Sequence, residues 1–501
     1  MIEPILAANS TWFAPTVSSV TRASITEIEI KDNYTPDVSV TVTDSWDASA
    51  AKDNSVMCYV IGTKLIIAGN GSGCIYANAD SFSVFSDFKI ANSIELGLLD
   101  TSRATTMKWM FYNCRAVQTL DLGQFDTSNV ANMNGMFMSC YALKTLDVNM
   151  FDTSNVTDMC YMFRSCRALT TLDLSGFNTS KVTDMHDMFS GCQVLTNLDV
   201  TNFNTSNVTN MDYMFSEDVK LTQLDVSKFD TSNCQYMSFM FYNCSPLKEI
   251  DVSNWDVSKV EYFDHFAAHA NLKRKGMERW NISSAVNLNA VFHNCTEEEL
   301  DLSGWDVSKN QFFCQMFENS PNLKRIKGLD KWDTSSGLGF DGMFERCYNL
   351  EEVDLSSFNT SKAKNNIEAS WYNGHQTTTL QNMFLSCNNL KKVKLGPNFS
   401  INGDGTNTTA ANKLILPTPS TDYIAGADGN WYAFNGDPYA PNAIPDRTAD
   451  IYFASFPLCQ DQDVIVKNGS MIDTAKAIRE KNGTTTKYNP SQFGEAIRAL
   501  N

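Results

Sequence analysis

Cysteine and histidine are two kinds of side chain in this 501-residue chain that could bind a metal or serve as a nucleophile and its base. The fourteen cysteines form no Cys-x-x-Cys pair. Eight of them recur at one position of a repeat, which is typical of small buried groups: Cys114, Cys140, Cys166, Cys192, Cys244, Cys295, Cys347 and Cys387. Of the five histidines, His265 and His269 lie four apart but enclose no glutamate of an HExxH motif. We therefore expect no catalytic residue, no metal site and no cofactor.

The best candidates for ligand binding lie in an insertion at residues 369–376, which interrupts the repeat. Trp371, Tyr372, Asn373 and His375 combine aromatic rings with polar groups, as sites that bind sugars or proteins do. Insertions in repeat arrays often collect on the binding face. The alternative is a surface loop that packs its own aromatic side chains.

A second candidate is the pair Trp431 and Tyr432, in a stretch rich in Gly, Asn, Pro and aromatic residues. If exposed, these rings would suit a carbohydrate. The alternative is that they pack the interior of a module that closes the C-terminal end of the array, since the last unit would otherwise expose an apolar end and an open sheet edge.

A repeat of 26 residues must position these side chains. A Met-Phe pair recurs at this spacing, as in Met162-Phe163 and Met188-Phe189, and twelve units share its phase. Such a period is typical of a solenoid whose units bury apolar faces on one another. The alternation in Leu172-Asp173-Leu174 predicts short strands that stack about 4.8 Å apart into a parallel sheet. The apolar spacing in Met159–Cys166 predicts a short helix on the opposite side.

Two columns of the repeat could also bind ligands. An aromatic column from Phe125 to Phe358 is expected to fill the core, with a sugar-stacking track as the alternative. An aspartate column that includes Asp121, Asp173 and Asp251 should face outward and could attract calcium or a basic partner. We expect instead that hydrogen bonds to neighbouring turns and solvent satisfy these carboxylates.

The expected fold is an α/β repeat solenoid, a leucine-rich-repeat-like right-handed array of about twelve 26-residue units with β-rich caps and a C-terminal helical hairpin. Met57–Ile61 and Leu65–Ala68 flank a Gly62-Thr63 turn and predict a β-hairpin in the N-terminal cap. The expected divisions are an N-terminal segment and cap at 1–83, the array at 84–395, a C-terminal capping module at 396–465 and the helical hairpin at 466–501.

The repeat closely resembles that of the BspA-type leucine-rich repeat family of bacterial and phage surface proteins. The resemblance rests on the Phe151–Met159 run followed by Met162-Phe163-x-x-Cys166, and it recurs over residues 84–395. The last segment, Ser470–Asn501, is similar to a short element at the ends of tail and baseplate proteins from phages of Gram-positive bacteria.

This resemblance implies a non-enzymatic binding protein of a phage tail, in a fibre, tip or baseplate, that recognises a glycan or protein receptor on the host cell. Other virion tail proteins would be partners, and a homotrimer would fit a fibre. A formal charge of −18 argues against nucleic acid. The sequence shows no apolar run of bilayer length and no secretory signal, in keeping with a virion assembled in the host cytoplasm. The alternatives are a bacterial cell-surface adhesin and a depolymerase of surface glycans.

Overall fold

The computed structural model describes residues 2–363, 380, 382–404, 413–434 and 437–455. The chain divides into two compact units, Met1–Ala285 and Val286–Asn501. The predicted helical hairpin at 466–501 lies outside the described residues. Within the described ranges, no helix is long and apolar enough to cross a membrane.

A five-stranded sheet in the order β2-β3-β4-β1-β6 caps the N-terminal end of the first unit. The predicted hairpin is confirmed: β3 (Met57–Ile61) and β4 (Lys64–Ala68) pair antiparallel around Gly62, whose φ of 63° suits a residue without a Cβ. The remaining elements of this cap are η1 (Asn9–Trp12), η2 (Arg22–Ser24), β1 (Glu27–Lys31), β2 (Asp44–Asp47), β5 (Ile75–Tyr76), β6 (Ser93–Glu95) and β7 (Leu99–Asp100).

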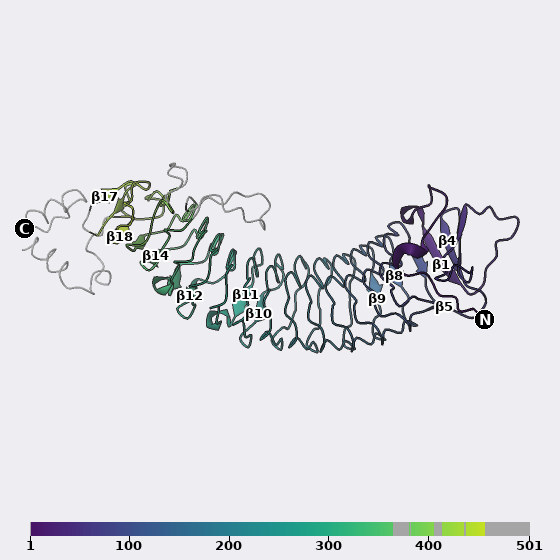
Figure 1. Ribbon diagram of the computed structural model, residues 1–501. Coiled ribbons are helices and arrows are strands. Elements are labelled where there is room, and N and C mark those ends of the chain that lie inside the picture. Colours follow the sequence, from purple (N-terminus) through teal and green to yellow (C-terminus); the bar gives the residue numbers. More distant parts are fainter. Residues whose placement is uncertain (1, 364–379, 381, 405–412, 435–436, 456–501) are drawn as a thin grey trace, which may run out of the picture. The chain divides into compact units, whose positions relative to one another are not determined.

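Coils of 26 residues make up the rest of the first unit. Parallel bridges link Asp80 to Thr106, Thr106 to Asn132, and so on in steps of 26 to Tyr262. Figure 1 shows these coils side by side between β8 and β10. The predicted repeat fold is therefore confirmed. The strands are shorter than expected: β8 (Thr119–Leu120), β9 (Thr145–Leu146), β10 (Glu249–Asp251) and β11 (Lys273–Lys275), the last followed by η3 (Met277–Arg279).

Stacked phenylalanines form the centre of each coil, because the Phe of the Met-Phe pair recurs in one phase. Phe137, Phe163 and Phe189 are fully buried, and their ring centroids lie 5.8 Å apart at angles of 10° or less. The phased cysteines lie beside this stack, and the Cys166 Sγ donates a hydrogen bond to the backbone carbonyl of Phe137 at 3.3 Å. Their predicted role as small buried groups is confirmed.

The predicted helix in the Met159–Cys166 segment is wrong. Tyr161 and Ser165 have φ values of 60° and 59°, which a right-handed helix excludes. The amide of Tyr161 donates to the carbonyl of His186 in the next coil, whereas the amide of Met162 closes a turn on Met159. Some backbone amides of this segment thus donate to the next coil and others close a turn within their own coil, so no helix forms. Helical structure in the described residues is confined to four short 3-10 turns, so the α component of the expected fold is absent there.

The second unit repeats the same packing and ends in an antiparallel cap. β14 (Glu352–Leu355) and β15 (Lys392–Leu395) pair in parallel, and β18 (Asp450–Phe453) covers the open edge of β15 in the antiparallel direction. This arrangement removes an unpaired edge. The other elements of this unit are β12 (Glu299–Asp301), β13 (Arg325–Lys327), η4 (Leu329–Lys331), β16 (Trp431–Tyr432) and β17 (Pro438–Tyr439).

The aromatic column is core. Phe125 and Phe151 are 3% exposed, and Trp332 and Phe358 are 1% and 0% exposed. Rings this deeply buried cannot stack on a sugar, so the alternative of a sugar-stacking track is wrong and the core interpretation is confirmed.

Candidate ligand-binding groove

The structure separates the two sets of side chains that the sequence nominated for ligand binding. Trp371, Tyr372, Asn373 and His375 lie outside the described residues. Trp431 and Tyr432 form β16 and are buried. The Trp431 Nε1 donates to the carbonyl of Pro417 at 2.8 Å, and the Tyr432 hydroxyl donates to Asp428. The geometry gives these two rings a packing role, and their predicted ligand role stays a prediction.

The aspartate column is satisfied by its own turns. The Oδ1 of Asp173 accepts a hydrogen bond from the backbone amide of Ser175 at 2.9 Å, and Asp199 accepts one from Thr201 at the same distance. Hydrogen bonds from Ser175 lower the pKa of Asp173 below its usual value. The expected bonding to turns is therefore confirmed. Among the described residues, no group of three or more His, Cys, Asp or Glu side chains could hold a metal ion.

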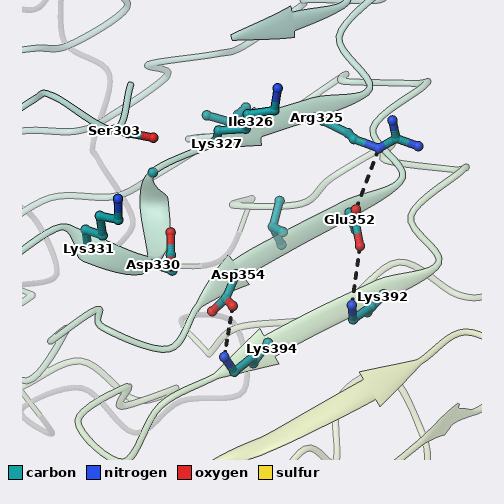
Figure 2. Close-up of a pocket in the computed structure, with 12 residues that line it drawn as sticks. Ser303, Arg325, Ile326, Lys327, Asp330, Lys331, Glu352, Asp354, Lys392 and Lys394 are labelled. Carbon is teal, nitrogen blue, oxygen red and sulfur yellow. Dashed lines mark hydrogen bonds and ion pairs between the residues drawn. The ribbon is translucent and has the colours of Figure 1, made fainter. Parts of the chain in front are cut away.

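A groove of about 470 Å³ lies on the outward face of β13, β14 and β15 in the second unit (Figure 2). This volume is within the range of clefts that bind small ligands. Side chains alternate between the two faces of a strand, so Ile326 and Val353 point into the core and the charged residues on either side of them point outward. The walls are therefore made of charged side chains.

The in-register pairing of β14 with β15, together with an ion pair between β13 and β14, arranges these charges in two rows that cross the strands. In the first row, Arg325 Nε lies 3.6 Å from Glu352 Oε1, and Lys392 Nζ lies 3.4 Å from Glu352 Oε2. In the second row, Lys394 Nζ lies 2.9 Å from Asp354 Oδ2 (Figure 2). Because each base lies beside an acid on the next strand, like charges do not meet.

The charges in the second row support one another. Partial burial raises the pKa of Asp354, but hydrogen bonds from Ser356 and Lys394 outweigh it and hold that pKa below its usual value. Asp354 is therefore ionised at neutral pH and available as a hydrogen-bond acceptor.

A short turn forms one end of the groove. The chain between Lys327 and Trp332 has one residue more than the equivalent stretch from Asp301 to Trp305, and the extra length forms η4. Gly328 begins this turn with a φ of 95°, and a Cβ there would lie 2.5 Å from the Cα of Ser303. Only glycine fits both the backbone conformation and this close approach. The turn brings Asp330 and Lys331 to the rim of the groove, across from Ser303 (Figure 2).

Asp330 and Lys331 differ from the rest of the wall because they are unpaired. Both are exposed, and among the described residues neither has an opposite charge within ion-pair distance. Lys327 makes one long contact, 3.6 Å to Glu299. The fields of Lys327 and Lys331 still reach Asp301, whose pKa is lowered first by hydrogen bonds from Ser303 and then by these two cations. An acceptor and a donor are thus available at the rim.

The groove was missed by reasoning from sequence, although a signal for it exists. The aspartate column is uniform from Asp121 to Asp251 but then alternates in sign: Lys275, Asp301, Lys327, Asp354 and Lys394. Alternating charges at one position of a repeat indicate a surface on which ion pairs replace single-sign carboxylates. The change is hidden when only the recurring aspartate of that column is considered.

Comparison with known proteins gives one family. The family described as "Mycoplasma protein of unknown function, DUF285" matches residues 80–195, 170–275, 248–326 and 326–395, which together exceed half of the chain. This match supports the BspA-type leucine-rich repeat that the sequence resembles. No functionally curated protein matches the chain.

Several solved structures are similar at low TM-score. A leucine-rich repeat protein from Bacteroides ovatus is 18% identical, with 62% of this chain and 80% of that chain covered and a TM-score of 0.31. One from Eubacterium ventriosum is 13% identical, with 56% and 72% covered and a TM-score of 0.29. A leucine-rich cell surface protein from Faecalibacterium prausnitzii is 13% identical, with 66% and 84% covered and a TM-score of 0.26.

Proposed function

The chain belongs to the DUF285 family, and we propose that it is a non-enzymatic binding protein of a phage tail, in a fibre, tip or baseplate, that recognises a receptor on the host cell. Its partners would be a glycan or protein of the host surface and other virion tail proteins, with a homotrimer as the form in a fibre. It would be incorporated into the virion in the host cytoplasm and would function as part of the virion tail.

The observation that carries the binding role is the contrast between a uniform interior and a varied outer face. The interior repeats the same Phe in coil after coil, and Cys in most coils, because stacking requires small and aromatic groups at fixed positions. The outer face instead changes from single aspartates to paired charges and opens into the groove at β13–β15. A repetitive scaffold that carries a polar concavity suits recognition.

The choice of a phage tail over a bacterial adhesin rests on the resemblance of the last segment, Ser470–Asn501, to elements of tail and baseplate proteins. The repeat itself fits either function, since the BspA-type family includes surface proteins of both bacteria and phages. The two functions differ in where the protein is found, so localisation decides between them.

The test is immunogold electron microscopy of a lysing culture of the strain that carries the gene, with an antibody against residues 84–395 and a strain deleted for the gene as control. We expect gold on the tails of particles. Gold on intact cell walls with none on particles would refute the virion role and favour the adhesin. Glycan cleavage by the purified chain would contradict the non-enzymatic role and favour the depolymerase.

A further inference from the structure

The groove on β13–β15 has a chemistry that selects among ligands. We infer that it binds an uncharged, polyhydroxylated chain, a neutral glycan, with Asp330 and Lys331 as direct contacts. This inference rests on the proposed function, since it names the receptor class that the groove would recognise.

The first argument is the balance of charge. Five cationic and three acidic side chains line the groove, and Glu299 and Asp301 next to it supply two further carboxylates. Opposite charges that lie a few ångströms apart cancel at longer range, so the groove has no strong field for attracting a polyanion or a polycation. In an acidic chain of net charge −18, a polyanion would also meet general repulsion.

The second argument is the distribution of donors and acceptors. Lys and Arg only donate hydrogen bonds, and ionised Asp and Glu only accept them. Along the first row a base on β13, an acid on β14 and a base on β15 follow one another, and β14 and β15 pair in register at the roughly 4.8 Å spacing of a sheet. A hydroxyl group both donates and accepts, so a chain with a hydroxyl on every unit can bond to an acid and a base in succession. A phosphate or carboxylate only accepts hydrogen bonds, so it could bond to the bases of each row but not to the acids.

The third argument is the pair at the rim. Glu352 and Asp354 already hold cations, at 3.4 and 2.9 Å from Lys392 and Lys394, and a ligand must compete with these ion pairs. Asp330 and Lys331 have no such partner in the described part of the chain. They can bond to a ligand without first breaking an ion pair, so their loss should weaken binding more than loss of a residue in the rows.

The chain provides a matched control for this pair. In the first unit, Gly276 begins the turn η3 with a φ of 96°, and Glu278 and Arg279 take the positions of Asp330 and Lys331. There, however, Arg279 Nε lies 3.5 Å from Glu278 Oε1. The same turn thus occurs in the first unit with its two charges paired. Its two charged side chains are also exposed, so the same substitutions can be made there.

The test is binding of the full-length chain to an array of purified bacterial surface polysaccharides, half of them neutral and half phosphate-bearing. Binding is measured at 0.15 M and 1 M NaCl, where the screening lengths are about 8 and 3 Å. We expect at least one neutral polysaccharide to bind with little salt dependence. The double variant Asp330→Asn, Lys331→Gln should bind it about tenfold more weakly or worse, whereas Glu278→Gln, Arg279→Gln should bind it like the wild type. Each single variant is measured as well, and thermal melting checks that all variants fold.

Three outcomes would overturn the inference. Binding restricted to phosphate-bearing polysaccharides and lost in high salt would assign the groove to polyanions. Equal loss in both double variants would place the contact elsewhere. Absence of binding to every neutral polysaccharide would refute the glycan assignment, while gold on particle tails would still leave the proposed tail function standing.

Discussion

The carboxylate oxygen Oδ1 of Asp218 accepts a hydrogen bond of 2.8 Å from the backbone amide of Cys192, 26 residues earlier. Asp218 is fully buried at the position that cysteine holds in the neighbouring coils. In those coils the thiol donates to a phenylalanine carbonyl, as Cys244 does to Phe215 at 3.0 Å. The Oδ2 of Asp218 is buried and makes no hydrogen bond to any residue that the structure describes. A carboxylate at this position cannot donate a hydrogen bond as the thiol does, whereas the protonated acid can. Burial favours that protonated form and raises the pKa of Asp218 well above its usual value.

Replacing Asp218 with cysteine should therefore stabilise the protein, and more so at higher pH. A carboxyl group with a raised pKa in the folded state contributes most below its unfolded pKa of about 4, and that contribution is lost as pH rises towards the folded value. We expect the Asp218→Cys variant to gain about 1–3 kcal/mol over the wild type at pH 8 and less at pH 5. Urea unfolding at both pH values measures the gain.

Asp218→Ser is the second variant, because Ser320 already shows how a hydroxyl fits this position: its Oγ donates to the carbonyl of Phe292 and accepts from the amide of Cys295, both at 3.1 Å. Asp225→Ser, at an exposed turn position, is the control and should not shift the pH dependence in this way. A wild-type stability that is flat between pH 5 and pH 8 would show that Asp218 does not titrate as described.

Gly328 should be intolerant of alanine. Its φ of 95° is strained for any residue with a Cβ, and the added carbon would meet the Cα of Ser303 at 2.5 Å. We expect Gly328→Ala to cost about 2 kcal/mol or more and to displace η4 from the groove. Gly304→Ala is the matched change, since a Cβ there has no atom within 4 Å. Thermal unfolding should separate the two variants, and equal melting temperatures would contradict the geometry.

The stacked phenylalanines should dominate the stability of the coils. Phe163 is fully buried, with ring neighbours at 5.8 Å on both sides. Phe163→Ala should cost about 3–5 kcal/mol, because the cavity cannot collapse in an array that is fixed from both sides. Met150→Ala, at a side chain that is 71% exposed, should change stability by less than about 0.5 kcal/mol. Chemical denaturation of both variants tests this contrast.

The sequence predicts the period and the core well because both follow from side-chain type. Met-Phe pairs every 26 residues can be buried together only if the coils stack, and the aromatic column is buried for the same reason. The helix was predicted wrongly because turns and helices share a spacing of three to four residues. What distinguishes them is the positive φ at positions such as Tyr161 and Ser165. No single residue type marks it, since the equivalent positions hold residues as different as Trp, Phe, Glu, Asn, Ser and Gly in different coils.

The groove could not be predicted from composition, because its residues are ordinary surface charges. What makes Asp330 and Lys331 distinct is the one extra residue before Trp332 and the absence of an ion pair with any described residue. The first is visible in the sequence as a shift in spacing. The second depends on side-chain positions, and the same turn at Glu278 and Arg279 has the opposite outcome.

Arg22 should hold the N-terminal cap to the first coil. Its Nη1 donates to the carbonyls of Ser83, Val84 and Ser86 at 3.0, 3.1 and 2.7 Å. Its guanidinium also lies over the rings of Trp12, Phe13 and Phe88 at 5.1–5.5 Å from their centroids. Burial lowers the pKa of Arg22 to about 10, so it stays charged at neutral pH.

Lysine cannot replace this contact in full, because an ammonium group lacks the planar face that lies over the three rings. We expect Arg22→Lys to lose about 2–3 kcal/mol of local stability. The loss should appear as faster hydrogen exchange of amides near residues 83–88, with the central coils around Phe163 unchanged, since units of a repeat array contact mainly their neighbours. The exposed Arg279→Lys serves as control. Equal protection of residues 83–88 in Arg22→Lys and the wild type would show that the cap is held by its apolar contacts alone.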